Sequence, residues 1–229
     1  MMFSALRKLK RVLLGKDFYF KPTIQIHSIK IGNKSEGWWI ADEKLQQGEN
    51  VVFSFGLGED ISFDLGMIKK FNSRVYGFDP TPKSLKFIKN LELPDTFILN
   101  EYAIAEKNGN LTFNLPFNEE HVSGSFMDIE SNNTITVEAK TFKTILDELD
   151  INLESIDIVK MDIEGAEYNV IENMIADNLM PKQLLIEYHH FFDSIDNQTT
   201  KKNINLLLQY YELFYVEDYN YSFIRKDVL

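Results

Sequence analysis

The sequence has no cysteine among its 229 residues. Disulfide bonds, zinc–thiolate centres and catalysis by a thiol are therefore excluded. It also lacks an unbroken apolar run long enough to span a bilayer or to form the central part of a secretion signal. No internal repeat, low-complexity segment or linker divides the chain. We therefore expect a cytoplasmic protein with one main domain, and an apolar content of 44% is ample for its core.

Positive charge is scarce, because 24 lysines and arginines stand against 35 aspartates and glutamates, for a formal net charge of −11. This balance argues against general nucleic-acid binding, which depends on basic side chains that displace counterions. Residues 1–16 are the exception, with five basic side chains, no acidic one and apolar residues at helical spacing. Such a helix either docks on its own acidic domain or lies as a peripheral anchor on an anionic membrane surface.

Residues 1–50 are expected to form this basic helix and a small cap in front of the main domain. The alternation of residues 19–30 predicts a half-buried strand, and Gly32-Asn33 predicts a turn that leads into Trp38 and Trp39. Residues 51–229 are then expected to form the main domain.

The main domain opens with the stretch VVFSFGLGED. Val51–Phe55 is an apolar run typical of a parallel strand buried on both faces. Gly56 and Gly58 permit a sharp turn and a close approach of the backbone to a ligand, because neither carries a Cβ. Asp60 and Ser62 can both cap the helix that follows, and the N-terminus of that helix favours an anion.

A second apolar strand ends at Asp79, about 20 residues after the glycines, where a carboxylate can hold a ribose diol. Strand, turn, helix, strand and acid together predict a nucleoside-cofactor site. Ile61 occupies the position where a dinucleotide fingerprint has its third glycine, which counts against NAD and FAD.

Strands and helices alternate from residue 51 to about residue 210, which predicts an α/β fold with a doubly wound, mostly parallel sheet. A closing hairpin at residues 212–225 would add an antiparallel edge strand, and the long polar loop 116–133 is a candidate functional segment. Ligands bind such sheets at the carboxyl ends of the strands. Polar or acidic residues follow five of the predicted strands, at positions 56–60, 79, 101–103, 162–164 and 187–190.

The order SFGLGED, FDP, KMDIEGAEY and LLIEYHH resembles the FkbM-type S-adenosylmethionine-dependent methyltransferases, from about residue 36 to residue 225. MDIEGAE is the most specific of these elements. The resemblance implies the class I methyltransferase (Rossmann-like) fold, in which a seven-stranded sheet has its last strand antiparallel. It also implies methyl transfer to oxygen, commonly to hydroxyls of sugars, glycolipids and polyketides.

The resemblance also implies roles for individual residues. Gly56 and Gly58 would lie against the methionine and ribose parts of the cofactor, and Asp79 would bind the ribose hydroxyls. Ala103 and its neighbours would flank the adenine, while Asp162 and Glu164 would lie beside the methionine end and the substrate. The implied cofactor-binding set is Ser54, Phe55, Gly56, Gly58, Asp60, Asp79, Pro80, Ala103, Asp162 and Glu164.

Two of these positions depart from the general class I pattern. Ser54 stands where that pattern has an acidic residue, and Asp60 stands where it has a third glycine. The contact to the ammonium group of the cofactor is therefore expected from Asp60 or Asp162.

A hydroxyl is a weak nucleophile until a base takes its proton. His189 is the first candidate, because it follows the fifth strand and an unperturbed histidine titrates near pH 6.5. Glu187 would orient His189 or serve in its place, and His190 is the main rival. Asp162, Glu187 and His189 could instead hold a divalent cation that activates the hydroxyl.

Two other classes of function compete with the leading hypothesis of an O-methyltransferase for a sugar, glycan or related small molecule. A nucleotide-sugar oxidoreductase or epimerase would need the missing glycine and a Tyr-x-x-x-Lys pair, which the sequence lacks. A non-catalytic nucleoside-binding scaffold would be expected to have lost the cofactor acids, yet Asp79 and Asp162 are present. Few cationic side chains follow the strands, which favours a neutral acceptor over a strongly anionic one.

Overall fold

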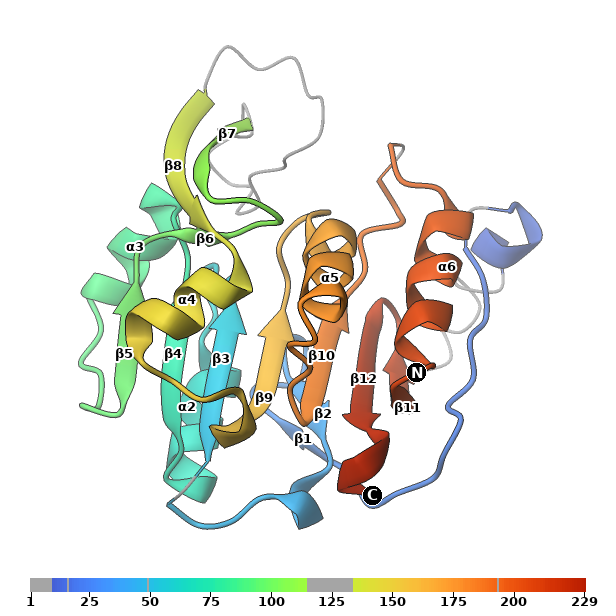
Figure 1. The fold of residues 1–229 in the computed structure, drawn as a ribbon, viewed down its shortest axis with the longest axis horizontal. Coiled ribbons are helices and arrows are strands. Elements are labelled where there is room, and N and C mark those ends of the chain that lie inside the picture. Colours follow the sequence, from blue (N-terminus) through green and yellow to red (C-terminus); the bar gives the residue numbers. More distant parts are fainter. Residues whose placement is uncertain (1–9, 16, 49, 115–133, 193) are drawn as a thin grey trace.

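The computed structural model describes residues 10–15, 17–48, 50–114, 134–192 and 194–229. At its centre is a seven-stranded sheet with the order β11-β12-β10-β9-β3-β4-β5 (Figure 1). The strands are β3 (Val51–Phe55), β4 (Arg74–Phe78), β5 (Phe97–Asn100), β9 (Ile156–Met161), β10 (Gln183–Glu187), β11 (Tyr211–Glu217) and β12 (Asn220–Arg225). The first five run parallel, and β12 is antiparallel to both of its neighbours. The predicted doubly wound sheet with an antiparallel last strand is confirmed.

One detail of the predicted sheet was wrong. The antiparallel strand β12 lies between β10 and β11, so the edge of the sheet is β11. Burial explains this order, because four successive residues of β12 are buried whereas the second half of β11 is only half-buried. A strand that is apolar on both faces is stabilised by a central place in the sheet.

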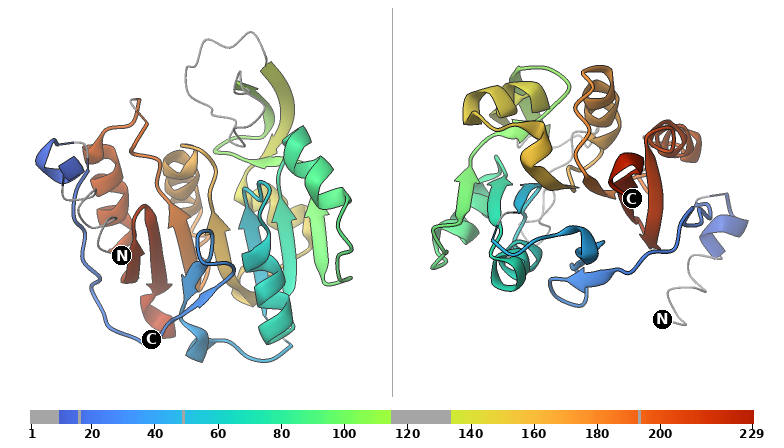
Figure 2. Two further views of the ribbon diagram at one scale, coloured as in Figure 1. Left: turned by 180° about the vertical axis from the view of Figure 1, so that it is seen from behind. Right: turned by 60° about the horizontal axis from the view of Figure 1, so that its bottom comes forward.

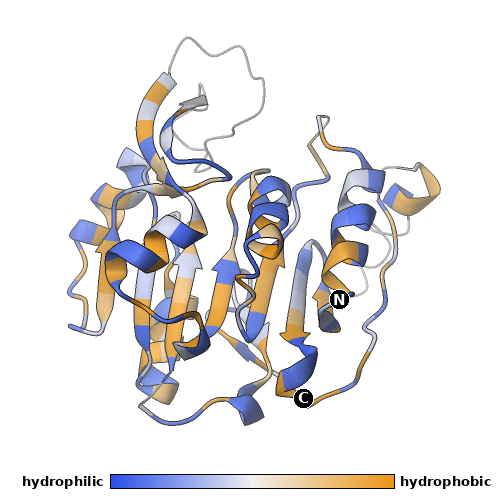
Figure 3. Ribbon diagram, viewed as in Figure 1, coloured by the Kyte–Doolittle hydropathy of each residue, from blue (hydrophilic) through white to orange (hydrophobic). Residues whose placement is uncertain are grey.

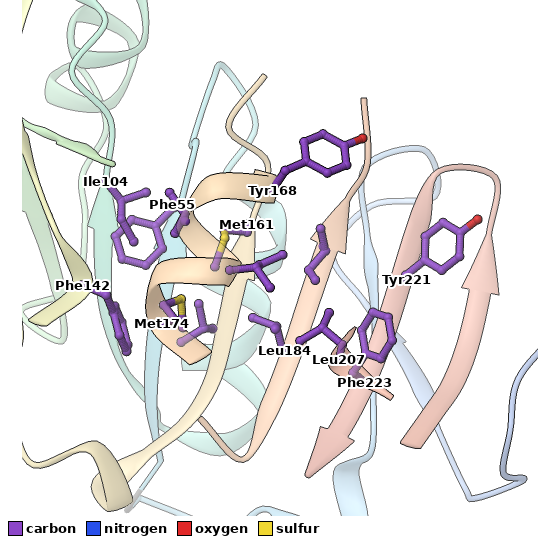
Figure 4. Packing of buried hydrophobic residues seen from close by; sticks show 14 of the residues in the cluster. Phe55, Ile104, Phe142, Met161, Tyr168, Met174, Leu184, Leu207, Tyr221 and Phe223 are labelled. Atoms are coloured by element: carbon purple, nitrogen blue, oxygen red, sulfur yellow. The ribbon is translucent and has the colours of Figure 1, made fainter. Parts of the chain in front are cut away.

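Helices cover both faces of the sheet. On one face, α4 (Phe142–Leu149), α5 (Glu167–Ala176) and α6 (Asn197–Leu207) pack over a large apolar cluster that includes Phe55, Phe142 and Met174 (Figure 4). On the other face, α2 (Ser62–Phe71) and α3 (Pro82–Lys89) cover the sheet (Figure 2). They enclose a second cluster around Met67 and Ile88. The apolar colouring of the central strands in Figure 3 shows why both faces need covering. Each large side chain buried in these layers contributes about 1.5–3 kcal/mol.

The N-terminal cap is smaller than expected. Its hairpin consists of β1 (Ile29–Ile31) and β2 (Trp38–Ile40), which pair antiparallel beside α2. The predicted strand over residues 19–30 was otherwise wrong. Two backbone N–H groups, of Thr23 and Ile24, donate to the carbonyl of Leu213, and Pro22 has no N–H to extend a ladder.

Of the basic segment, residues 10–15 are described, and residues 10–13 are helical. They lie against the protein's own domain, since the Arg11 guanidinium is 5.6 Å from the centre of the Tyr219 ring and Asn197 donates a hydrogen bond to the Gly15 carbonyl. Leu13 and Leu14 are 78% and 62% exposed. Among the described residues, no helix combines the length and the apolar character needed to cross a bilayer.

A second, three-stranded sheet lies above the carboxyl ends of the central strands (Figure 1). It consists of β6 (Ala103–Ile104), β7 (Gly109–Asn114) and β8 (Thr134–Lys140), in the order β6-β8-β7. The polar loop 116–133, singled out as a candidate functional segment, lies outside the described residues.

Candidate active site

A cavity of about 410 Å³ lies at the carboxyl ends of β3, β4, β9 and β10. The sequence pattern placed the site at this edge of the sheet, and the volume is within the usual range for a small-molecule site. Most of the predicted cofactor residues line it, namely Phe55, Gly56, Gly58, Asp60, Asp79, Pro80, Ala103, Asp162 and Glu164. Ser54 lies buried beneath the lining, and of the three candidate bases Glu187 belongs to it.

Gly56 is required by a close approach within the protein. Its φ is +78°, and a Cβ at this position would lie 1.7 Å from the carbonyl oxygen of Asp162. The Phe55 carbonyl accepts a hydrogen bond from the Asp162 N–H at 3.0 Å, which draws the two turns together. The sequence pattern predicted a close approach by a ligand at this glycine. In the structure, the carbonyl of Asp162, directly after β9, already lies against Gly56 where a Cβ would be.

Asp79 holds the glycine turn in place. One of its oxygens accepts hydrogen bonds from the N–H groups of Leu57 and Gly58, both at 3.0 Å. The other accepts from the N–H and the hydroxyl of Thr81, at 2.8 and 2.6 Å. A carboxylate offers about four lone-pair positions, and protein donors use all of them here. A ribose hydroxyl would reach Asp79 only by replacing one of these donors, most readily the rotatable hydroxyl of Thr81.

Asp60 is also engaged by its surroundings. It accepts a hydrogen bond from the Ser62 N–H at 2.7 Å, and the side chain of Asn33 donates to it from the cap. The N-cap residue of α2 is Ile61, which lies between the two predicted capping residues, Asp60 and Ser62. Asp60 therefore ties the cap to the start of α2.

The MDIEGAE element forms a tight turn between β9 and α5. Glu164 has a φ of +55°, which is unusual for a residue other than glycine. The fully buried carboxylate of Glu167 accepts hydrogen bonds from the N–H groups of Ile163 and Gly165 and thereby closes the turn. The turn presents Asp162 and Glu164 to the cavity.

His189 is 2% exposed and lies among carboxylates. Its Nδ1 is 2.8 Å from Glu167, and its Nε2 is 3.5 Å from Glu164 and 3.6 Å from Asp162. Burial lowers the pKa of His189, but these three carboxylates outweigh it and raise the pKa to about 10. The ring is therefore protonated at neutral pH, which removes the reason for choosing His189 as the first candidate base. Glu167, not Glu187, holds its Nδ1.

Glu187 lines the cavity at the end of β10. Burial and the neighbouring carboxylate of Asp162 raise its pKa to about 8, despite the opposing effect of His189 and Lys160. A carboxylate with a raised pKa is a stronger base than an ordinary one.

His190 is directed away from the cavity. Its Nε2 lies 3.2 Å from Asp17, and its ring packs against Phe18 and Tyr219. The strand has ended at Glu187, and the chain turns so that successive histidines meet different surroundings. This placement leaves His190 without access to an acceptor in the cavity.

Negative charge dominates the cavity. Among its described lining residues, the one cationic side chain is Lys160, whose ammonium donates to the Gly56 carbonyl. Eight lining residues carry carboxyl groups: Glu36, Glu59, Asp60, Asp64, Asp79, Asp162, Glu164 and Glu187. Such a surface attracts cationic ligands and repels anionic ones.

One group of side chains could contact a single metal ion. Ligand atoms of Asp162, Glu164 and His189 all lie within 4.8 Å of one another. The hypothesis from the sequence placed Glu187 in this group and did not include Glu164. In the part of the chain that the structure describes, the group contains Glu164 and does not contain Glu187.

Sequence reasoning missed Lys160, Glu167, Thr81 and Asp64. Lys160 had a signal, because a lysine inside an otherwise apolar strand needs a local reason. Glu167 and Asp64 each lie in the first turn of a helix, where an acidic residue is ordinary. Nothing in the order of residues distinguished them from surface acids.

Residues 43–223 match the family model described as the methyltransferase FkbM domain. No curated protein sequence matches the chain. Several solved structures are similar, all with low identity. The fibrillarin/Nop5p complex is 9% identical over 78% of this chain and 73% of that one, with a TM-score of 0.46.

A Methanococcus jannaschii fibrillarin pre-rRNA processing protein is 10% identical over 79% of this chain and 68% of that one, with a TM-score of 0.45. Aeropyrum pernix fibrillarin with natively bound S-adenosyl-L-methionine is 10% identical over 78% and 66%, with a TM-score of 0.41. These scores are low, so assignment to a family rests on the match over residues 43–223.

Proposed function

The chain belongs to the FkbM methyltransferase family, and from this premise we propose that it transfers a methyl group from S-adenosylmethionine to a hydroxyl of a neutral sugar, glycan or related small molecule. The family and the class I fold are established, as the resemblance implied, and membership of this family supports S-adenosylmethionine as the methyl donor. Oxygen as the methylated atom and a carbohydrate as the acceptor are the proposal. The division of the chain at residue 50 stays a prediction.

The cavity suits the cofactor by its charge. When bound, S-adenosylmethionine supplies a methyl group on a positively charged sulfur. Eight carboxyl-bearing residues and one lysine line the cavity, so a cation is favoured there. Phe55, Phe78 and Trp38 add aromatic surface for the adenosine part and for the sulfonium.

The same charge supports a neutral acceptor. A phosphorylated or sulfated acceptor would meet eight carboxyl-bearing residues with one lysine to offset them. The long phosphate backbone of a nucleic acid is disfavoured for the same reason, in keeping with the net charge of −11. Hydroxyl groups of a neutral sugar, in contrast, can donate hydrogen bonds to these carboxylates.

We assign the base to Glu187. It lines the cavity, whereas His189 lies behind Asp162 and Glu164. With a pKa of about 8, Glu187 is ionised in a fraction of the molecules at neutral pH, and this ionised form is a stronger base than an ordinary carboxylate. Glu187 takes the hydroxyl proton as the oxygen–methyl bond forms, which contributes about 10²–10⁴-fold to the rate. His189 is then a positioning residue whose positive charge holds Asp162 and Glu164 in place.

A divalent cation is the alternative occupant of the position between Asp162, Glu164 and His189. Oxygen and imidazole ligands suit such an ion. We expect no requirement for it, because protonated His189 already offsets the two carboxylates. Activity that disappears on complete chelation and returns with magnesium or manganese would reverse this assignment.

Methyl-labelled S-adenosylmethionine tests the proposal directly. The purified protein is incubated with it and with a panel of neutral glycosides and glycolipids, a matched panel of sugar phosphates, and RNA. Mass spectrometry then locates the label. We expect an O-methyl ether on a neutral glycoside and no labelled sugar phosphate. Label found on nitrogen, on carbon, or on RNA alone would contradict the proposal.

A further inference from the structure

Asp64 is a buried acid at the floor of the cavity that the proposed chemistry does not use. Its side chain is 1% exposed and belongs to the cavity lining. Asp64 Oδ1 and the neighbouring Ser54 hydroxyl, itself fully buried, form no well-made hydrogen bond with the described residues. Burial raises the pKa of Asp64, and the Ser54 hydroxyl and the backbone of α2 nevertheless lie near enough to oppose that rise. A buried carboxylate oxygen without a full hydrogen bond is costly to a folded protein. It is retained where a ligand supplies the missing partner.

Helix capping does not explain Asp64. Acidic residues in a first helical turn commonly accept hydrogen bonds from free N–H groups. Here α2 begins after Ile61 with no side-chain cap, and Asp60 accepts the hydrogen bond from the Ser62 N–H. Asp64 lies deeper, between the helix and the sheet.

The sheet places one cation beside Asp64. Ser54 and Lys160 are register partners on β3 and β9, on the face of the sheet that α2 covers. Lys160 lowers the pKa of Asp64, although burial dominates and raises that pKa to about 6. The ammonium of Lys160 also donates to the Gly56 carbonyl and lies 4.0 Å from Asp162. Asp64 and Lys160 thus contribute a negative and a positive side chain to the same part of the cavity lining.

We propose that Asp64 and Lys160 form the subsite for the zwitterionic amino-acid end of the cofactor, with Asp64 receiving its ammonium and Lys160 facing its carboxylate. An α-amino acid carries these opposite charges on one carbon, so two adjacent opposite side chains match it. Asp64, at the start of α2, takes the role that the general class I pattern gives to an acid at the position of Ser54. The proposal rests on the cofactor assignment and is independent of the acceptor.

Calorimetry with three ligands on the wild-type protein tests the subsite. The ligands are S-adenosylhomocysteine, its analogue with hydrogen in place of the α-amino group, and 5′-methylthioadenosine, which lacks the amino-acid end. We expect the loss of the amino group to weaken binding by about 10- to 100-fold, the usual contribution of a hydrogen bond to a charged group. Equal affinity for the first two ligands would overturn the proposal without touching the cofactor assignment. No binding of any of the three would overturn both.

Two matched variants locate the effect. Asp64→Asn removes the charge with little change of shape, and Asp60→Asn removes a carboxylate four residues earlier in the same lining. We expect Asp64→Asn to weaken S-adenosylhomocysteine by the same 10- to 100-fold and to leave 5′-methylthioadenosine unchanged. Asp60→Asn should alter both only slightly. If Asp60→Asn weakened the binding of S-adenosylhomocysteine and Asp64→Asn did not, the ammonium would be assigned to Asp60.

Discussion

The two sides of the cavity satisfy their charges in different ways. On the turn side, formed by residues 56–58 and 79–81, the acid Asp79 accepts four hydrogen bonds from its own neighbours. On the acid side, formed by Asp162, Glu164, Glu167, Glu187 and His189, three carboxylates contact one imidazole and Glu187 adds a fourth carboxyl group. The turn side is complete without a ligand, and the acid side has a surplus of negative charge.

This difference distinguishes acids that stabilise the fold from acids that are available to bind a ligand. A carboxylate whose lone pairs all meet donors contributes to stability. One that is buried beside other carboxylates lowers stability, and proteins keep such groups where activity needs them. Substitution of a fully hydrogen-bonded acid, such as Asp79, and of a buried acid with an unsatisfied oxygen, such as Asp64 at the floor of the cavity, should therefore change stability in opposite directions.

The largest effect is expected where the two sides touch. Gly56→Ala would place a Cβ 1.7 Å from the Asp162 carbonyl, at a φ of +78°. We expect a loss of more than about 4 kcal/mol in the free energy of unfolding, or no folded protein. Gly15→Ala is the control, because Gly15 has a φ of +70° but no atom within 4 Å of the position that a Cβ would take. It should lose about 1 kcal/mol. If urea denaturation gave the same loss for Gly56→Ala and Gly15→Ala, the close contact between residue 56 and the Asp162 carbonyl would not constrain the fold.

Removal of the base should affect turnover most. Glu187→Gln is expected to lower kcat by about 10²–10⁴-fold, because the acceptor hydroxyl keeps its proton, with little change in affinity for S-adenosylhomocysteine. Glu59→Gln is the control on the turn side, since Glu59 also lines the cavity but pairs with Lys83 at 3.0 Å. It should retain nearly full activity. Comparable losses in the two variants would argue against a specific role for Glu187.

Stability should fall when the acid of the turn side is changed. Asp79→Asn replaces an acceptor of four hydrogen bonds with a group that has two donors of its own, which face the N–H groups of Leu57 and Gly58 or of Thr81. We expect a loss of about 2–4 kcal/mol, measured by chemical denaturation. A variant as stable as the wild type would show that the turn does not depend on this carboxylate.

The smallest expected change has the opposite sign. Burial raises the pKa of Asp64 to about 6, above its unfolded value of 3.8, so the folded protein binds more protons between these values. The contribution of Asp64 to stability therefore declines as the pH rises through this window. Asp64→Asn should gain about 1–3 kcal/mol at pH 7.5 and much less at pH 4.5. Thermal unfolding at both pH values measures this, and a less stable variant at pH 7.5 would indicate a structural role for Asp64.

Local patterns were sufficient for the strands and for the edge at which the site lies. Val51–Phe55 and Ile156–Met161 have the bounds that their apolar runs predicted. The glycines and acids after these strands identified the cavity for the same reason, since parallel strands bring their carboxyl ends to one edge. The positions of the two hairpin strands in the sheet were predicted wrongly, because the choice of the edge strand depends on how both faces of each strand are covered.

The choice between His189 and His190, and the protonation of His189, came from the tertiary structure. The two residues are adjacent in the chain, but one meets Glu167 and the other meets Asp17, and these partners are far away in sequence. A pKa depends on the charges and the burial around a group, which no local pattern contains. The roles of Asp64 and Glu167 were hidden for the same reason.

By itself, the sequence determined the class of protein and the order of its sheet elements along the chain, because repeated apolar runs and glycine turns are properties of neighbouring residues. S-adenosylmethionine as the cofactor followed from the family resemblance, of which the MDIEGAE element is the most specific part. The tertiary structure decided which acids are satisfied by the protein and which face the cavity. That distinction depends on packing between elements that are far apart in the chain. The adjacent residues His189 and His190 illustrate it, because one contacts Glu167 and the other contacts Asp17.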